Sequence, residues 1–275
     1  MTALVDLIVM LGMFAVIPIG LTLIGGPGTA SAARLWPLAA VPGALSLWLP
    51  RGALATALAT AYACATLVLA ALAPLRLRRA RSCLTGPAEI AVLTALVAPS
   101  VAGIALVAER SGHRLFGFDL KILALTVPHF HFAGFTAALI AALVCRAAPD
   151  RPAARAAALS VPVGTLLVLA GYFIGNWTQL LGALVLTTGM WLVGLLTWRE
   201  LRTLTRDRLT GGLFAVSSTV LAATMLLALW WALGRAAGFP HPTLTWMAAT
   251  HGLGNALGFA LCSLLAWRRL EELHP

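Results

Sequence analysis

Apolar residues occupy this chain in long runs that are separated by short segments rich in arginine, glycine and proline. The runs reach about twenty residues, the length at which a helix crosses the hydrocarbon core of a bilayer. None alternates apolar and polar residues with the period of two that a membrane β-strand requires, so we predict α-helices. The nine predicted spans cover roughly 3–24, 35–50, 53–73, 87–108, 122–145, 157–175, 178–198, 211–233 and 244–267.

The second predicted span is the weakest of the nine. It has only about sixteen residues and is interrupted by Pro37, Pro42 and Gly43, so we expect it to be tilted or re-entrant. Eight full spans are therefore the alternative. No basic segment precedes the first run, which indicates a retained span rather than a cleaved signal peptide. Neither a soluble linker nor an internal repeat separates the runs, and the chain is expected to be a single integral membrane domain, 1–275.

The composition supports an all-α, polytopic transmembrane bundle. Hydrophobic residues make up 60% of the chain and charged residues 10%, with a mean hydropathy of +0.93, whereas soluble domains carry about 25% charged residues. A net charge of +10 would suggest nucleic acid in a soluble protein, but here the arginines lie in short loops, so we expect no nucleic-acid partner. They cluster after the third, fifth, seventh and ninth spans, at Arg76, Arg78, Arg79, Arg81, Arg146, Arg151, Arg155, Arg199, Arg202, Arg206, Arg208, Arg268 and Arg269.

This arginine pattern also predicts an orientation. Cytoplasmic loops are enriched in Lys and Arg, and the clusters fall at every second boundary, as that rule requires. With nine spans, the N-terminus lies outside and the C-terminus in the cytoplasm. We expect the protein to lie in the inner, or cytoplasmic, membrane, with the lipid bilayer as its constant partner.

Three histidines lie where lipid should surround them. His129 and His131 follow Pro128 in the fifth span, and His251 lies in the ninth, four residues before Asn255 on the same helix face. On an ideal helix His129 and His131 point about 200° apart, so both face one site only if the backbone is distorted; otherwise one faces a neighbouring helix. Both segments enter from outside and place their histidines at similar depth. We therefore predict that His251 shares an outer-leaflet pocket with at least one of the others.

Other polar residues lie near the same predicted outer end. Asn176 marks the turn between the sixth and seventh spans, and Glu109 and Asp119 belong to the loop before the fifth span. Each has an ordinary structural interpretation beside the functional one, because asparagine often joins helices and loop carboxylates are usually solvated. With the histidines they complete the candidate catalytic set of His129, His131, His251, Asn255, Asn176, Asp119 and Glu109.

The two histidine segments resemble a known family. His129-Phe-His131-Phe-Ala-Gly-Phe135 and Thr250-His-Gly-Leu-Gly-Asn255-Ala-Leu-Gly-Phe259 are similar to segments of the YndJ-like family of bacterial integral membrane proteins, and they occur in the same order. The resemblance implies a multi-helix membrane protein, with a transporter as the usual functional label. It singles out His129, His131, His251 and Asn255 and implies no particular reaction.

Two main functions compete. Intramembrane ionisable groups point to function, and buried imidazoles beside an amide are suited to proton transfer, which favours an enzyme doing isomerase, cyclase or hydrolase chemistry on a lipophilic small molecule. The alternative is a YndJ-like transporter. Against transport, we find no inverted repeat, and we expect few buried polar residues in the cytoplasmic half. A scaffold would leave the histidines unexplained, and the sequence does not give the oligomeric state.

A cofactor is needed only for a third alternative. His129, His131 and His251 are the candidate ligands for a transition metal such as zinc, iron or copper, or for haem; acid–base chemistry needs none. The four cysteines, Cys64, Cys83, Cys145 and Cys262, have no metal-ligand spacing, and we expect neither a metal site nor disulfides from them.

Overall fold

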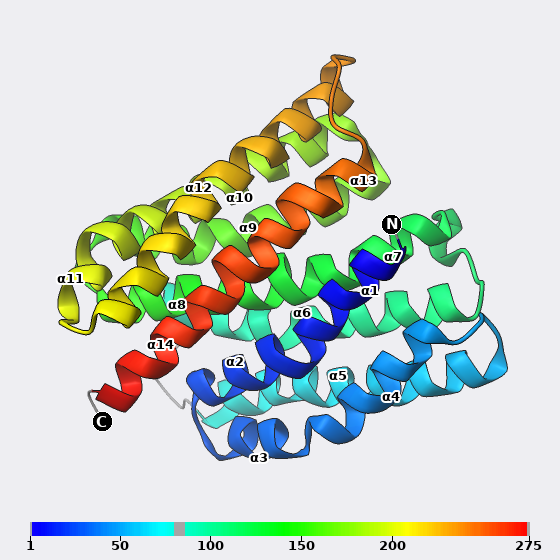
Figure 1. The fold of residues 1–275 in the computed structure, drawn as a ribbon, viewed down its shortest axis with the longest axis horizontal. Helices are drawn as coiled ribbons and strands as arrows, with labels where there is room; N and C mark the ends of the chain where they lie inside the picture. Colours follow the sequence, from blue (N-terminus) through cyan, green and yellow to red (C-terminus); the bar gives the residue numbers. More distant parts are fainter. Residues whose placement is uncertain (1, 80–85, 274–275) are drawn as a thin grey trace. The chain divides into compact units, whose positions relative to one another are not determined.

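The computed structural model describes residues 2–79 and 86–273, and within these ranges the chain is helical without strands (Figure 1). Eight helices in this part of the chain are long and apolar enough to span a membrane. Eight of the nine predicted spans are thereby confirmed, and the protein is a multi-pass membrane protein. The eight are Ala3–Ile24, Ala53–Arg78, Pro87–Arg110, Leu120–Ala147, Pro152–Ile174, Asn176–Leu204, Arg208–Ala237 and Leu244–Leu273.

The second predicted span, 35–50, corresponds to α4 (Pro37–Trp48), which is apolar but shorter than the eight long helices. It is preceded by a second short helix, α3 (Pro27–Leu35). The indole N–H of Trp36, at the junction of the two helices, donates to the Met13 carbonyl, half-way along the first span, at 2.7 Å. Arg110 at the end of α6 (Pro87–Arg110) donates to carbonyls at the end of α4, including Leu47 at 3.2 Å. These bonds tie the start of α4 to the first span and its end to α6.

The helices form two compact units. Unit 1 is Met1–Leu84 with Leu93–Thr136, and unit 2 is Thr85–Val92 with Ala137–Pro275. Unit 1 contains α1 (Thr2–Leu11), α2 (Ile17–Ile24), α3, α4, α5 (Ala53–Arg79), most of α6 and α7 (Leu120–His129). Unit 2 contains α8 (Ala137–Ala147), α9 (Pro152–Ile174), α10 (Asn176–Leu196), α11 (Arg202–Leu204), α12 (Arg208–Ala237), α13 (Leu244–Met247) and α14 (Cys262–Leu273).

Wide, π-helical turns interrupt several spans. They are η1 (Gly12–Val16), η3 (Phe130–Thr136), η4 (Thr197–Leu201), η5 (Ala248–Gly252) and η6 (Gly254–Leu261). Both histidine segments contain such turns, which occur often at functional sites. Pro128 does not break its helix: α7 continues through it to His129, and the hydrogen-bond ladder widens immediately afterwards in η3. After Pro128 the backbone therefore changes helix type and does not break.

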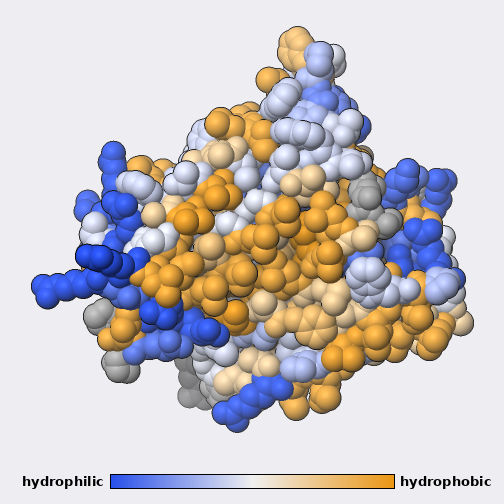
Figure 2. All heavy atoms as spheres, in the orientation of Figure 1, coloured by the Kyte–Doolittle hydropathy of each residue, from blue (hydrophilic) through white to orange (hydrophobic). Residues whose placement is uncertain are grey.

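Glycines bring α9 and α10 of unit 2 into backbone contact. A Cβ atom at Gly164 would lie 2.5 Å from the Leu186 backbone nitrogen, and one at Gly171 would lie 2.5 Å from the Gln179 backbone nitrogen. Such contacts replace the hydrophobic effect as the main attraction between helices in lipid. On the drawn face of unit 2, apolar side chains cover the middle of the η6–α14 stretch, and hydrophilic ones gather at the α11 end (Figure 2).

Candidate functional site

The buried centre of unit 1 contains a hydrogen-bonded histidine and tyrosine. His131 in η3 and Tyr62 in α5 are both 0% exposed. The Tyr62 hydroxyl oxygen lies 2.7 Å from Nε2 of His131, and the two rings meet edge to face with their centroids 6.0 Å apart. A polar pair at this depth is costly unless all of its hydrogen-bonding groups are satisfied.

This pair lacks one hydrogen bond. Nδ1 of His131 is buried and has no partner, a condition it shares only with the Trp267 indole nitrogen among the described residues. If the Tyr62 hydroxyl donates to Nε2, then Nδ1 carries an unpaired N–H. If Nε2 donates instead, the Nδ1 lone pair and the phenol hydrogen are both unpaired. Every neutral tautomer therefore leaves a buried polar group unsatisfied.

The surroundings of the pair are tight. The Trp36 ring packs edge to face on Tyr62 with centroids 5.7 Å apart. A Cβ atom at Gly43 would lie 2.9 Å from the Tyr62 ring, and one at Gly12 would lie 2.5 Å from His131 Nδ1. The backbone of Gly12 in η1, which has no side chain, therefore covers the unsatisfied Nδ1 of His131.

His129 does not join this pair. It is exposed at the end of α7, and its ring meets Phe130 edge to face at 6.2 Å. Of the two arrangements that the sequence allowed, the structure adopts the one in which only one of the two histidines, His131, is buried in the interior of unit 1.

The third histidine belongs to a network in unit 2. His251 Nδ1 donates to the Thr224 carbonyl at 2.8 Å, so Nε2 is the acceptor, and the Asn255 amide nitrogen lies 3.3 Å from it. The Asn255 carbonyl oxygen lies 2.8 Å from the Thr224 hydroxyl. Both ring nitrogens of His251 have partners, in contrast to His131. The expected pairing of His251 with Asn255 is confirmed.

Gly254 and Gly258 pack closely on α12. A Cβ atom at Gly258 would lie 2.7 Å from a Val220 methyl group, and one at Gly254 would lie 3.0 Å from the Thr224 methyl group. This close approach is what allows His251 to reach a backbone carbonyl of the neighbouring helix. His131 belongs to unit 1 and His251 to unit 2, and the pocket predicted to contain both stays a prediction.

Glu109 is not in a loop, and that part of the prediction was wrong. It lies in the last turn of α6 and is 2% exposed. Arg51 donates to it through Nε and Nη2, at 2.9 and 2.7 Å, and Arg110 donates to it through Nε. The helix continues beyond the apolar run because these two arginines neutralise the acid at its end.

Asp119 and Asn176 occupy structural positions. Asp119 is exposed and caps α7 by accepting from the Lys121 N–H at 2.8 Å; this bond, with Arg114 nearby, holds the pKa of Asp119 below its usual value. The Asn176 side chain donates to the Arg235 carbonyl at 3.0 Å and accepts from the Arg235 guanidinium at 3.2 Å, and so ties the start of α10 to the end of α12. These contacts agree with the structural interpretations of both residues.

A seam of polar contacts continues along α12 and α14, beyond His251. The hydroxyls of Ser217 and Ser263 lie 2.5 Å apart, and both side chains are buried. At the far end Asp207 accepts from the Thr210 hydroxyl at 2.6 Å and from Arg269 at 3.1 Å. The end of unit 2 predicted to be cytoplasmic therefore does contain buried polar side chains, contrary to our expectation. Small hydroxyls on apolar helices are easily overlooked, because they add little to hydropathy.

Metal ligands do not gather in the described residues. No three His, Cys, Asp or Glu side chains there form a group that could hold a metal ion. Cys64, Cys145 and Cys262 are free thiols, and Cys83 lies outside the described residues.

Comparison with known protein families shows to which family the chain belongs. The model of the YndJ-like protein family matches residues 7–259, which include both histidine segments and the Tyr62 helix. The chain belongs to the YndJ-like family. No curated protein and no solved structure matches it significantly. Family membership thus confirms the resemblance and leaves the activity of this YndJ-like protein to be argued from its residues.

Sequence reasoning missed the partners of both histidines in this YndJ-like protein. Tyr62 is one of only two tyrosines in the chain and lies in the middle of an apolar run. Buried phenols need a hydrogen-bond partner, so its position was a usable signal. Thr224 gave no such signal, because a threonine within a membrane helix commonly bonds its own backbone.

Proposed function

We propose that this YndJ-like protein is a membrane-embedded enzyme that performs acid–base chemistry on a lipophilic small molecule, with His131 and Tyr62 as the working pair. The observation that carries the proposal is the buried, unsatisfied Nδ1 of His131. Groups of this kind call for an explanation, and a ligand that completes the hydrogen bonding is one. His251, whose ring nitrogens are both bonded, is assigned to holding unit 2 together.

The pair has the properties that proton transfer requires. With Nε2 hydrogen-bonded to Tyr62, Nδ1 is left as the nitrogen that meets substrate. As a base it takes a proton from one substrate carbon and, as the resulting imidazolium, returns it to another, which is an isomerisation with no net change in the enzyme. Tyr62 fixes the ring and stabilises the imidazolium by accepting from Nε2–H.

Access to Nδ1 requires movement of η1. Gly12 covers this nitrogen in the structure, and it lies in a π-helical turn that is followed by Pro18 at the start of α2. Proline removes a hydrogen-bond donor from the ladder. The segment over the site is therefore less firmly bonded than a continuous α-helix, and a lipophilic molecule can reach it from the bilayer.

The test compares lipid extracts of cells that express equal membrane amounts of the wild type, His131→Asn, Tyr62→Phe and His129→Asn. We expect the ratio of two isomeric lipophilic compounds to change when the wild type is expressed. With His131→Asn or Tyr62→Phe, the ratio should return to its value in cells without the protein. His129→Asn is the matched control, since it lies two residues away and is exposed; it should behave as the wild type. Identical extracts from wild type and His131→Asn would reject the enzyme proposal.

Transport is the second candidate, and the polar seam of α12 and α14 favours it. Small hydroxyls and charged groups follow one another along both helices of this seam. Protein in liposomes loaded with a pH-sensitive dye should then dissipate an imposed proton gradient, and Ser217→Val should slow this. Gradients that decay as in empty liposomes would reject proton transport.

We also propose that the N-terminus lies outside the cell and the C-terminus in the cytoplasm, in the inner membrane. The arginine clusters support this orientation. The polar end of unit 2 that contains Asp207 and Arg269 is then cytoplasmic.

A further inference from the structure

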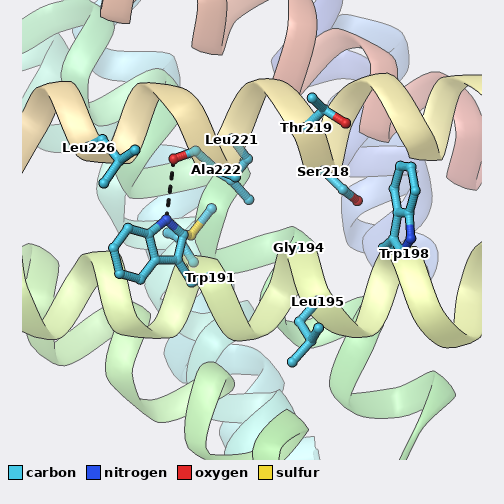
Figure 3. A pocket seen from close by; sticks show the side chains of 10 residues that line it. Trp191, Gly194, Leu195, Trp198, Ser218, Thr219, Leu221, Ala222 and Leu226 are labelled. Atoms are coloured by element: carbon cyan, nitrogen blue, oxygen red, sulfur yellow. Dashed lines mark hydrogen bonds between the residues drawn. The ribbon is translucent and has the colours of Figure 1, made fainter.

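A groove lies between α10 and α12 of unit 2, and no histidine is among its lining residues. Its volume is about 510 Å³, and Trp191, Gly194, Leu195, Trp198, Thr219 and Ala222 are among its lining residues (Figure 3). We call it the α10–α12 groove. Gly194 contributes to the groove because it has no side chain to fill it. Several lining side chains are well exposed, including Leu195 at 43% and Trp198 at 41%.

The groove offers an occupant almost only hydrocarbon. The hydroxyls of Ser218 and Thr219 donate to carbonyls of their own helix, each at 2.9 Å. The indole N–H of Trp191 points across to the Ala222 carbonyl at 3.4 Å (Figure 3). With these polar atoms already bonded, a ligand in the middle of the groove gains only apolar contact, as an acyl chain would.

One end of the groove is cationic. Trp198 lies at that end (Figure 3), and the guanidinium carbon of Arg202 lies 4.1 Å from the centre of its ring. Arg199, the next residue after Trp198, is exposed. Among the described residues no carboxylate pairs with Arg202, so its guanidinium donors are available to an anion. Guanidinium groups bind phosphate by paired hydrogen bonds.

We propose that the α10–α12 groove binds an anionic phospholipid, with an acyl chain along the groove and the headgroup phosphate on Arg202. An apolar trough that ends at a tryptophan and an arginine matches the order of chain, interface and phosphate in one lipid leaflet. The cationic end is also the end that the arginine pattern assigns to the cytoplasm, where anionic lipids concentrate. This proposal does not depend on the enzymatic one.

Native mass spectrometry of detergent-purified protein tests it, with phosphatidylglycerol and phosphatidylcholine of identical chains as the probes. The wild type should retain phosphatidylglycerol preferentially. Arg202→Gln should weaken that retention about five-fold and leave phosphatidylcholine unchanged. Arg206→Gln is the matched control, because Arg206 is exposed and, unlike Arg202, does not stack on Trp198.

A second pair of variants tests the acyl chain. Ala222→Phe fills the groove and should reduce retention of both lipids, whereas Ala223→Phe, equally exposed on the next position of α12, should reduce neither. Equal retention of phosphatidylglycerol by wild type and Arg202→Gln would overturn the proposal, as would equal losses for the two phenylalanine variants. A dimer that Ala222→Phe dissociates would also overturn it, since a second copy would then be the occupant.

Discussion

Replacing Gly12 by alanine places a methyl group against the buried ring of His131. The new Cβ would lie 2.5 Å from Nδ1, 3.0 Å from Cγ and 3.1 Å from Cβ of His131. The ring cannot turn away without losing its hydrogen bond to Tyr62. Overpacking of this kind costs about 1–3 kcal/mol, whereas alanine in place of glycine stabilises a helix interior by up to about 1 kcal/mol. Because the new methyl group would meet both the ring and the Cβ of His131, we expect the overpacking cost to exceed the helix gain. Gly12→Ala should therefore be destabilising.

The same substitution should become stabilising when the ring is absent. In a His131→Ala background the methyl group meets no imidazole, and only the helix gain of up to about 1 kcal/mol remains. The two substitutions should therefore couple by about 1–3 kcal/mol, which is the overpacking cost alone, because the helix gain is present in both backgrounds and cancels. Equilibrium unfolding in mixed micelles, followed by tryptophan fluorescence, gives the four free energies.

Gly212→Ala provides the control, because a Cβ atom at that helical position meets nothing within 4 Å. It should be neutral or stabilising in both backgrounds. If Gly12→Ala has the same effect with and without the His131 ring, then Gly12 does not cover Nδ1 as described. Access to Nδ1 would then not depend on movement of η1.

Three further outcomes are expected. Glu109→Gln should cost about 1–3 kcal/mol in the same unfolding assay, because Arg110, whose side chain is 12% exposed, loses the acid with which it pairs; a change as small as that of Asp119→Asn, at the exposed cap of α7, would contradict this. Hydrogen bonds from Thr210 and Arg269 lower the pKa of Asp207 from 3.8 to about 2. Its contribution to stability is therefore complete above pH 3.8 and is lost as the pH falls towards 2, so the stability difference between wild type and Asp207→Asn should shrink over that interval and not at higher pH. Reporter fusions after Arg155 and Arg208 should report cytoplasm and one near Gly238 the outside; opposite signals at the two arginines would exclude the proposed topology.

The spans could be predicted because lipid imposes one simple requirement on them. A helix that faces hydrocarbon must be apolar along its whole length, and hydropathy alone locates it. The first span is predicted as 3–24 and observed as Ala3–Ile24. The second, predicted as 35–50, corresponds to the shorter apolar helix Pro37–Trp48, and hydropathy alone does not decide whether so short a helix crosses.

The candidate site was predictable only in part. His131 and Asn255 stand out because polar groups are rare in such helices, but which groups they bond depends on the pairing of helices distant in sequence. Sequence spacing could not show that Tyr62 faces His131 across sixty-nine positions of the chain. Nor could it show that Glu109 is enclosed by Arg51, since a residue at the end of an apolar run is equally consistent with a solvated loop.

The glycine contacts between α9 and α10 have a consequence for biosynthesis. Because backbone meets backbone at Gly164 and Gly171, neither helix can make this packing until the other has been synthesised. Their connection is a single glycine turn at Gly175. The first helix to be synthesised therefore gains its partner within seconds, and the two are expected to leave the translocon together as a hairpin.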